Sequence, residues 1–478
     1  MALEWVSGAV ELRCPVCAHS EGQELLARVD VTWRDAGVEI ARCSACGAIV
    51  LGAMLPPSMY TDADWDWYVE QIGGVEAIAD TLVQTGMRRG ARMLDVGCGY
   101  GFALDVARFL YEWEGIGLDP SIAAARGRRD LDLDIRPGTL DDAFDPDERF
   151  QVIFSSEVLE HIADPMEFLR AVHRRLAPDG IVVLTTPDAR AVTPQTPWTI
   201  LFPVLSVGLH EFLVDADGLE RMLRDAGFHA KVWQIGFGLH AVGSLDPRAL
   251  DAVTPGACAP RKDLASYAEM RCDEAAQGSA LELGMAGRQL KWMVSSEDFA
   301  RASAHLPKLR QALHDRYSID LDDPKQIVGR PGVPPVLTPV FCNLGILRLW
   351  YEQDAPRAAD CFEAAAWAGR AQWDVYGQYQ DPETPAYEAL ARGHLASTLA
   401  RVAPERVPAV LQELDEGMAR GAGDEDVVAA AKARVNAEFA LRRSRTRRIL
   451  RRARSVAGGA RRRLRRAIRG RPWSGRRA

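Results

Sequence analysis

The sequence lacks any long hydrophobic run. Its closest approach, WTILFPVLSVGL at 198–209, is 12 residues long and contains Pro203, whereas a membrane-spanning helix needs about 18 apolar residues or more. The opening residues also lack the combination of basic residues, apolar block and small-residue cleavage site that marks a secretory signal. We therefore expect a protein that is neither secreted nor membrane-spanning, and we predict a cytoplasmic location.

Acidic residues are missing from the C-terminal end. Of the 58 lysines and arginines, 17 lie in 442–478, so the preceding 441 residues hold 41 basic against 66 acidic groups. Such a segment repels itself, and we expect 441–478 to be disordered in solution. Its apolar residues recur at helical spacing, which predicts short interfacial helices on an anionic membrane, at the inner membrane face. Nucleic acid is a weaker alternative because Trp473 is the only aromatic residue of the tail, and a solvated tail lying on the acidic body is a third.

Cysteines are few, but four of the nine form two C-x-x-C pairs, Cys14 with Cys17 and Cys43 with Cys46. In an intracellular chain this spacing favours a metal over disulfides. Each pair can aim two thiolates at one ion from a tight turn, and two pairs complete a tetrahedral sulfur site typical of structural zinc. Redox-active pairs and free buried thiols are the alternatives. We predict a zinc ribbon over residues 1–60.

The stretch RMLDVGCGYGFALDVARF at 92–109 places three glycines at alternate positions after a short apolar run. The pattern predicts a buried strand at 92–98, a turn that lets a ligand approach the backbone, and a helix at 103–111. A ligand of such a turn lies at the carboxyl edge of a parallel sheet, beside a helix N-terminus. A second predicted strand ends in Asp119, whose carboxylate is placed to accept hydrogen bonds from both hydroxyls of a ribose.

Two nucleotide-binding chemistries are excluded by what this turn lacks. A P-loop needs a lysine after its glycines, and a dinucleotide fingerprint needs glycine at 102, where Phe102 stands. The remaining pattern, h-h-D-x-G-x-G-x-G with Asp95 before the first glycine, resembles motif I of class I S-adenosylmethionine-dependent methyltransferases. Later segments, 149–188 and 210–236, resemble later parts of the same family in the same order, so the likeness runs over about 85–243.

The resemblance implies an α/β fold, with a Rossmann-like doubly wound methyltransferase sheet over residues 61–245, and S-adenosylmethionine (SAM) as cofactor. The glycine turn would hold the methionine moiety and Asp119 the ribose. Thr139 would bond the adenine amine where the family often has an acid, and Leu140 would contact the ring. The cofactor contacts so implied are Asp95, Gly97, Gly99, Gly101, Asp119, Thr139 and Leu140.

Two histidines are candidates for assisting the methyl acceptor. His161 and His210 follow predicted strands on the cofactor edge, and histidine can act as a general base near neutral pH. The E-x-x-E-H spacing predicts Glu157, Glu160 and His161 on nearly one helical face. It resembles the divalent-metal site of small-RNA and ubiquinone-type O-methyltransferases, with His210 as a fourth ligand for Mg²⁺ or a similar ion. A base acting without metal and a purely structural role remain open, since acids at a helix start also favour the macrodipole.

A second resemblance suggests the acceptor. The cysteine pairs leading into this fold resemble a bacterial subset of these enzymes that methylate sugars, nucleotide-sugars or cell-surface glycans, which indicates polysaccharide biosynthesis. An O-methyltransferase of another small metabolite, of quinone or polyketide type, and a catalytically silent scaffold are the alternatives. The segment 193–209, rich in proline and aromatic residues, is expected to shape the acceptor mouth.

Helical periodicity replaces strand patterns after about residue 245, so we predict an all-α region over 246–440. Within it, 341–370 resembles one tetratricopeptide-type repeat of two helices. One repeat is fewer than the three or so needed for a free-standing solenoid. The region is therefore predicted to be a partner-binding surface or a helical cap on the enzyme. The small residues expected at the helix contact, and the aromatic residue expected to fill the gap, are Gly345, Ala358, Ala365 and Phe362.

Overall fold

The computed structural model of the chain describes residues 2–31, 34–54, 66–71, 73–86, 89–138, 140, 143–376, 383–422 and 425–443. The described residues form two compact units. The sheet unit comprises 2–54 and 77–258, and the helical unit comprises 66–76 and 259–443. The predicted fold class is confirmed: a Rossmann-like sheet, a cysteine-bearing N-terminal region and an all-helical C-terminal region.

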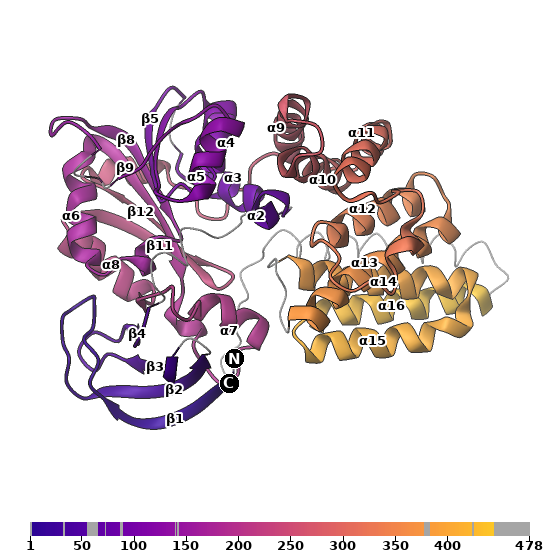
Figure 1. Cartoon of the computed structure of the whole chain (residues 1–478), viewed down its shortest axis with the longest axis horizontal. Coiled ribbons are helices and arrows are strands. Elements are labelled where there is room, and N and C mark those ends of the chain that lie inside the picture. Colours follow the sequence, from indigo (N-terminus) through magenta and orange to yellow (C-terminus); the bar gives the residue numbers. More distant parts are fainter. Residues whose placement is uncertain are drawn as a thin grey trace. The chain divides into compact units, whose positions relative to one another are not determined.

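A seven-stranded sheet forms the centre of the sheet unit (Figure 1). The strand order is β11-β12-β9-β8-β5-β6-β7, parallel from β9 through β7 and antiparallel at β12 and β11. The strands are β5 Arg92–Val96, β6 Glu114–Leu118, β7 Asp134–Arg136, β8 Phe150–Ser156, β9 Leu176–Pro187, β11 His229–Ile235 and β12 Gly238–Ser244.

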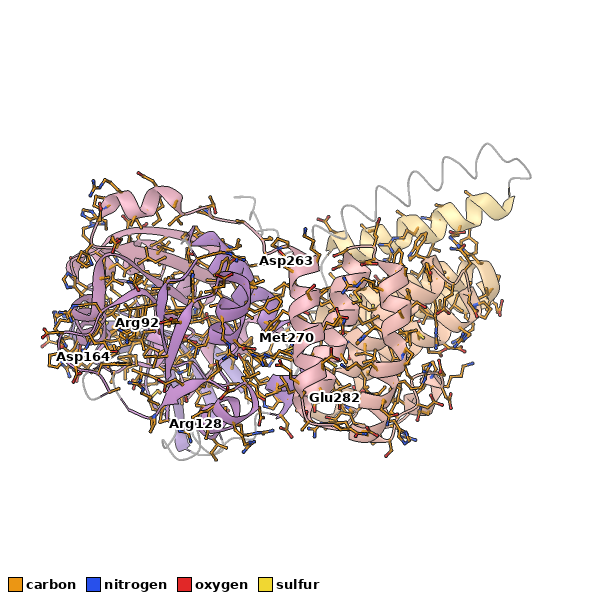
Figure 2. The ribbon with its side chains drawn as sticks, turned by 90° about the horizontal axis from the view of Figure 1, so that it is seen from above. Arg92, Arg128, Asp164, Asp263, Met270 and Glu282 are labelled. Carbon is orange, nitrogen blue, oxygen red and sulfur yellow. The ribbon has the colours of Figure 1, made fainter. Side chains whose placement is uncertain are left out.

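Three of the helices between these strands begin where a side chain satisfies a free backbone N–H group, whereas α4 begins at the glycine turn without such a cap. Ser121 accepts a hydrogen bond at the start of α5, Asp164 at the start of α6 and Asp215 at the start of α8. Figure 2 labels Asp164 at its helix end. The helices are α3 Gly74–Gln84, α4 Phe102–Tyr111, α5 Ile122–Asp130, α6 Pro165–Arg175 and α8 Ala216–Asp225.

The strand order reverses at β5. The chain passes from β5 outward to β6 and β7, and then returns to β8 on the other side of β5. In open α/β sheets, ligands bind at such a switch point, beyond the carboxyl ends of the strands. The segments that begin at Gly97 and Glu157 follow β5 and β8 directly, so the topology brings them to the same edge.

The N-terminal residues form a second sheet, with order β1-β2-β3-β4-β10. Its first four strands belong to the ribbon, which we define as residues 2–54. The fifth, β10, comes from the segment just before α8 and pairs antiparallel with β4. The strands are β1 Ala2–Val10, β2 Gln23–Val31, β3 Arg34–Arg42, β4 Ile49–Leu51 and β10 Phe212–Leu213.

The ribbon shares its cores with the rest of the sheet unit. Cys14 and Cys43 belong to the hydrophobic cluster that contains Leu94 of β5 and Phe212 of β10. The other ribbon face packs against helix α7, Trp198–Leu205. The segment 193–209 thus lies against the ribbon, and its expected role at an acceptor mouth stays a prediction.

The helical unit contains α2, Asp66–Glu70, and the first residues of α3 as well as the C-terminal helices. Helices α9 and α10 lie side by side, and Figure 2 labels Met270 on the first and Glu282 on the second. The helices are α9 Arg261–Glu274, α10 Ala280–Ser295, α11 Phe299–Tyr317, α12 Leu337–Trp350, α13 Ala355–Tyr376, α14 Thr384–Val402, α15 Val407–Ala419 and α16 Glu425–Arg443. Short 3₁₀ turns are η1 Leu159–His161, η2 Ala189–Ala191, η3 Pro247–Ala252, η4 Pro324–Ile327 and η5 Pro404–Arg406.

Helices α12 and α13 form the predicted pair over 341–370. A Cβ atom on Gly345 would lie 2.6 Å from the Phe362 ring, so the glycine permits the close contact expected there. The likeness to a tetratricopeptide repeat stays a prediction, as does the four-part division of the chain. Among the helices in the described ranges, none is both long and apolar enough to cross a membrane. Residues 444–478 of the basic tail lie outside the described residues.

Candidate functional site

The turn after β5 lies against the turn after β8. Gly97 has a φ of 72°, and a Cβ atom there would lie 2.4 Å from Cγ2 of Val158. A side chain at this position would therefore separate the two turns. The glycine turn, residues 97–101, and the segment that carries Glu157, Glu160 and His161 are thus held together at the switch point of the sheet.

Asp119 ties the glycine turn to the end of β6. Its Oδ2 accepts a hydrogen bond from the backbone N–H of Gly99 at 2.8 Å, and its Oδ1 accepts one from Ser121 N–H at 2.8 Å. The side chain is only partly buried, and a carboxylate has lone pairs left after two such bonds. A Cβ atom on Gly99 would meet nothing within 4 Å among the described residues, so the backbone there can be approached closely.

The cofactor side of the site holds two carboxyl groups, those of Asp95 and Asp119, that influence each other. Asp95 is 2% exposed, and burial together with the nearby charge of Asp119 holds the pKa of its carboxyl well above the usual range. Two carboxyl groups in this arrangement suit a ligand with positive charge, which would relieve their repulsion. An ammonium and a sulfonium group, as SAM carries, meet that requirement.

The two predicted adenine contacts are Leu140 and Thr139. Leu140 is buried in the same hydrophobic cluster as Leu94 of β5, and its contact with an adenine ring stays a prediction. Thr139 lies outside the described residues. Sequence reasoning missed Val158, whose side chain occupies the space beside Gly97.

Three candidate acceptor-side residues converge as predicted. Ligand atoms of Glu160, His161 and His210, which we call the Glu–His cluster, all lie within 4.8 Å of one another. Each imidazole Nε2 is 3.9 Å from Oε1 of Glu160. The two rings meet edge to face, with their centroids 4.7 Å apart.

Backbone carbonyls orient both rings in the same way. Nδ1 of His161 donates to the carbonyl of Leu209 at 2.8 Å, and Nδ1 of His210 donates to the carbonyl of Val204 at 2.9 Å. Because a carbonyl only accepts, each Nδ1 carries the proton, and the Nε2 of each neutral ring, 3.9 Å from Oε1 of Glu160, carries none. Oε1 of Glu160 is buried and has no hydrogen-bond partner among the described residues, while its Oε2 accepts from Thr186 at 2.9 Å.

Glu157 does not share this arrangement, and the expectation of one helical face was wrong. The helical turn η1 begins only at Leu159, and Glu157 has a φ of 56°. Its carboxylate accepts a hydrogen bond from Thr185 at 2.9 Å. Among the described residues it is not one of the grouped ligands. Glu157 is therefore held by Thr185 of the neighbouring strand β9, and the cluster of possible ligands has three members.

Burial governs the protonation of the Glu–His cluster. It raises the pKa of Glu160 well above its usual value, and the charge of Glu157 adds to the effect. Burial also lowers the pKa of His161, and it lowers that of His210 to about 3 with a smaller contribution from His161. The two imidazoles are therefore neutral, and a bound cation would stabilise the ionised form of Glu160 that burial disfavours.

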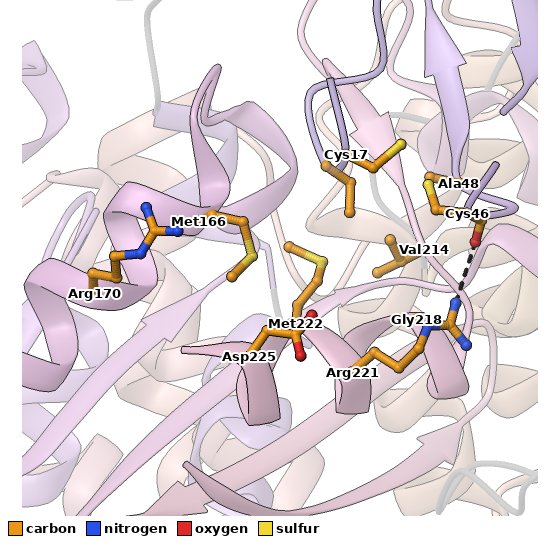
Figure 3. A pocket seen from close by; sticks show the side chains of 11 residues that line it. Cys17, Cys46, Ala48, Met166, Arg170, Val214, Gly218, Arg221, Met222 and Asp225 are labelled. Carbon is orange, nitrogen blue, oxygen red and sulfur yellow. Dashed lines mark hydrogen bonds between the residues drawn. The ribbon is translucent and has the colours of Figure 1, made fainter. Parts of the chain in front are cut away.

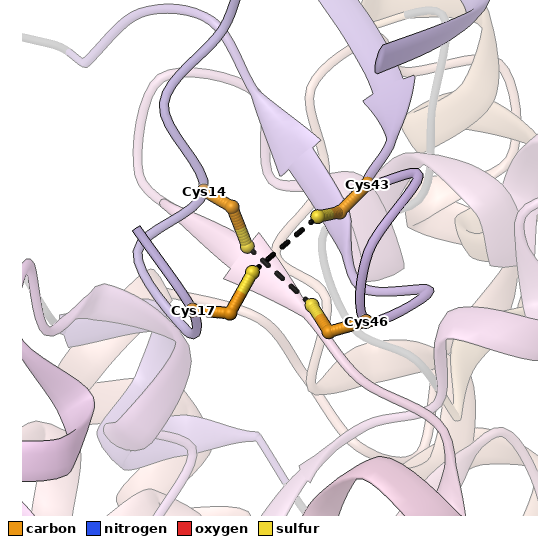
Figure 4. Close-up of side chains that lie close together, drawn as sticks. All are labelled: Cys14, Cys17, Cys43 and Cys46. Carbon is orange, nitrogen blue, oxygen red and sulfur yellow. Dashed lines mark hydrogen bonds between the residues drawn. The ribbon is translucent and has the colours of Figure 1, made fainter. Parts of the chain in front are cut away.

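The four ribbon cysteines form a second cluster (Figure 4). The sulfurs of Cys14 and Cys46 are 3.6 Å apart, as are those of Cys17 and Cys43. A zinc ion with Zn–S bonds of about 2.3 Å needs sulfurs roughly 3.8 Å apart, whereas a disulfide needs about 2.05 Å. The spacing fits a tetrahedral metal site with all four positions taken by sulfur.

A hollow of about 350 Å³ lies beside this cysteine cluster (Figure 3). Met166 of α6 and Met222 of α8 form much of its apolar lining. Figure 3 shows Arg221 directed toward Cys46, whose carbonyl accepts a hydrogen bond from its guanidinium at 3.2 Å. Its lining includes no residue of the glycine turn or of the Glu–His cluster, so this hollow is distinct from the predicted cofactor site.

Comparisons with known proteins agree with the fold of the sheet unit. A family model described as a methyltransferase domain matches residues 70–231. The ubiquinone biosynthesis O-methyltransferase of Ruegeria pomeroyi is 30% identical over 187 residues, which cover 37% of this chain and 74% of that protein. The protein of the same name from Azorhizobium caulinodans is 36% identical over 105 residues, which cover 20% of this chain and 41% of that protein.

A solved structure is also similar. Phosphoethanolamine N-methyltransferase 2 of Haemonchus contortus, in complex with SAM, shares 20% identity at a TM-score of 0.32, over 39% of this chain and 48% of that one. The chain spans about two fifths of the length of the first curated relatives that it matches.

Proposed function

The chain belongs to the class I SAM-dependent methyltransferases, and on that premise we propose that it methylates a hydroxyl oxygen of a small-molecule acceptor. The observation that carries the proposal is the Glu–His cluster, which stands beside the glycine turn at the switch point of the sheet. An oxygen acceptor must lose a proton during transfer, and the cluster offers the groups that can assist this loss.

The proposed site has a cofactor side and an acceptor side, formed by different residues. When bound, SAM supplies a methyl group made electrophilic by its sulfonium. Asp95 and Asp119 offer negative charge to the cofactor, and Gly99 leaves its backbone open to close approach. On the acceptor side, Glu160 and the two imidazoles would align the hydroxyl and accept its proton. Alignment of this kind can supply several kcal/mol of the barrier.

A divalent cation held by the Glu–His cluster is part of the proposal. The Nε2 atom of each imidazole lies 3.9 Å from Oε1 of Glu160. That oxygen has no hydrogen-bond partner among the described residues. Two nitrogens with one carboxylate suit zinc, iron(II) or manganese better than Mg²⁺, which prefers oxygen ligands. A bound cation would lower the pKa of an acceptor hydroxyl. His161 or His210 acting as a base without metal is the alternative.

Two acceptor classes remain in the proposal. The curated relatives named above are ubiquinone biosynthesis O-methyltransferases, which favours a phenolic hydroxyl of quinone type. A sugar, nucleotide-sugar or cell-surface glycan is the second candidate, supported by the cysteine-bearing ribbon that precedes the methyltransferase fold. We also propose structural zinc at the four ribbon cysteines, whose sulfur spacing fits it.

The test is transfer of a radiolabelled methyl group from SAM into catechols and quinols, nucleotide-sugars and lipid-linked glycans. We expect label in one class of acceptor. This label should be lost on chelation and restored by added metal.

The variant His210→Ala should bind SAM in calorimetry but transfer no label, whereas His229→Ala, at an exposed position, should behave as the parent. Absence of a SAM binding heat, or a heat unchanged by Asp119→Ala, would overturn the enzyme reading in favour of a silent scaffold. Label that survives chelation would contradict the proposed divalent cation at the Glu–His cluster.

The tail and the helical unit carry further proposals. We propose that the protein is cytoplasmic, that the arginines of 442–478 bind anionic lipid at the inner membrane face, and that the helical unit binds a protein partner. The tail's 17 arginines and lack of acid support the first. Deletion of 442–478 should release the chain from anionic vesicles and leave SAM affinity unchanged. A truncated chain that still sediments with the vesicles would contradict this.

A further inference from the structure

The cysteine cluster is connected to the Glu–His cluster by a short path of backbone hydrogen bonds. At the ribbon end, the N–H of Cys43 donates to the carbonyl of Ala48 at 2.7 Å, and that of Gly47 donates to the carbonyl of Cys43 at 2.9 Å. This turn contains Cys46 and leads directly into β4, which starts at Ile49. Whatever fixes the four sulfurs therefore fixes the start of β4.

Strand β4 in turn holds the segment that carries His210. Val50 pairs with Phe212 of β10, and the N–H of Leu51 donates to the carbonyl of Glu211 at 3.1 Å. The N–H of Glu211 donates to the carbonyl of Glu160 at 2.7 Å. Because β4 has three residues and β10 has two, this pairing is too short to stand without anchors at its ends.

The second ribbon face supports the same cluster through α7. Val204 and Leu205 of α7 pack with Ile40 and Leu51 of the ribbon in one hydrophobic cluster. The carbonyl of Val204 orients His210. The ribbon thus holds both the backbone next to His210 and the helix whose carbonyl fixes the tautomer of that ring.

The cofactor side has its own supports. The glycine turn is fixed by Asp119 through Gly99 and by the contact between Gly97 and Val158. Gly97 N–H also donates to the carbonyl of Leu118, at the end of β6, at 2.8 Å. These hydrogen bonds and the glycine contact all lie within the seven-stranded sheet and its edge, and the ribbon meets this side through the hydrophobic cluster that Cys14 and Cys43 share with Leu94 and Leu118.

We infer that the cysteine cluster is a positioning device for the Glu–His cluster, so that metal occupancy of the ribbon sets the acceptor side of the site and leaves the cofactor side unchanged. The link to acceptor chemistry rests on the proposed function, whereas the positioning itself does not. A ribbon of this kind loses its fold without metal. The short β4–β10 pairing then loses its anchor, and His210 loses its fixed distance from Glu160.

The test compares Cys17→Ser with Cys258→Ser in the full chain. Both cysteines are exposed, but only the first belongs to the cluster. We expect Cys17→Ser to lose zinc and to exchange the Glu211 amide hydrogen about tenfold faster or more, while the SAM dissociation constant stays within about threefold of the parent. Cys258→Ser should match the parent in all three measurements. Because zinc content and Glu211 exchange need neither SAM nor an acceptor, a failure of the proposed function would leave these two readouts unaffected.

Two results would overturn the inference. One is a zinc-free Cys17→Ser chain that keeps the slow exchange of Glu211. The other is a parallel loss of SAM binding and of protection throughout the sheet unit, which would make the ribbon a general support for the fold. Should Cys17→Ser fail to fold, the parent chain is stripped of metal by a chelator and refilled with zinc, and the same amide is followed. Protection that does not change across that cycle would equally overturn the inference.

Discussion

At the scale of single residues, two glycines of the same turn have different surroundings. A methyl group on Gly97 would overlap Val158, whereas one on Gly99 would point into open space among the described residues. Both have positive φ, at 72° and 52°, so an alanine at either position costs about 1–2 kcal/mol of backbone strain. An alanine at Gly97 therefore tests the packing between the two turns, and an alanine at Gly99 tests whether a ligand approaches the backbone there.

We expect Gly97→Ala to lower the free energy of unfolding by about 2–4 kcal/mol, because overlap adds to the strain. Gly99→Ala should lower it by only about 1–2 kcal/mol and should weaken SAM binding about tenfold or more, since its methyl group occupies the open side of the turn. Chemical denaturation and calorimetry measure the two effects. A Gly99→Ala chain that binds SAM as tightly as the parent would show that the cofactor lies elsewhere.

Asp95 predicts a proton linked to cofactor binding. Burial, followed by the charge of Asp119, raises its pKa in the folded protein, so ionisation of Asp95 destabilises the ligand-free fold as the pH rises from its unfolded value of about 3.9. The positive charges of SAM favour the carboxylate. Binding should therefore release a proton, and affinity should increase as the pH rises through the raised pKa.

Calorimetric titrations with SAM in phosphate and in Tris test this linkage, because the two buffers take up a proton with different heats. The parent chain should show a buffer-dependent heat that corresponds to proton release. Asp95→Asn should bind more weakly and lose that dependence. Equal heats for the parent in both buffers would contradict the assignment of Asp95 to the cofactor side.

At the scale of elements, helix contacts in the helical unit depend on side-chain size. Helices α12 and α13 approach closely where Gly345 faces Phe362. By contrast, a Cβ atom on Gly417 of α15 would lie 3.5 Å from Ala422, an ordinary contact distance. Glycine inside a helix destabilises the fold by roughly 0.5–1 kcal/mol relative to alanine. A glycine-to-alanine substitution is therefore stabilising unless the added methyl group overlaps a neighbour.

Gly345→Ala should therefore destabilise the helical unit by about 1–3 kcal/mol, while Gly417→Ala should be neutral or stabilise it by up to about 1 kcal/mol. Denaturation followed by helical circular dichroism measures both. Phe362→Leu, which removes the ring that is contacted, should recover part of the loss in the double variant. Equal effects of the two alanines would mean that α12 and α13 do not meet at Gly345.

Some elements could be predicted from sequence because their cause is local. The glycine turn, Asp119 and the two cysteine pairs each depend on residues a few positions apart. Pairings across the chain could not be predicted in the same way. The short strand β10 joins the ribbon sheet from residues 212–213, and Glu157 leaves the predicted helical face because Thr185 on another strand holds its carboxylate. No spacing within either segment encodes its distant partner.

At the scale of the whole molecule, the helical unit includes residues that precede the seven-stranded sheet in sequence. Glu76 accepts hydrogen bonds or ion pairs from Arg261, Lys291 and Trp292 at 2.6–3.1 Å. Glu70 pairs in the same way with Arg316 and Tyr317, each at 2.6 Å. These buried groups join the segment 66–76 to helices that begin about 185 residues later.

Removing one charge from this buried network should be costly. Glu76→Gln leaves Lys291 and Arg261 short of a partner, so we expect a loss of about 3 kcal/mol in the free energy of unfolding of the helical unit. Glu269→Gln breaks a half-exposed pair with Arg301 and should cost less than about 1 kcal/mol. Urea denaturation of both variants checks the difference. Similar costs would mean that the segment 66–76 contributes little to the helical unit.

The early position of that segment has a consequence for synthesis on the ribosome. Residues 66–76 emerge before the whole seven-stranded sheet, yet their partners start at Arg261. At about 5–20 residues per second, translation needs roughly 10–40 s to supply them. During that interval Glu70 and Glu76 have no arginine or lysine of the helical unit to meet. The nascent sheet can therefore fold before Glu70 and Glu76 meet their partners on α9, α10 and α11.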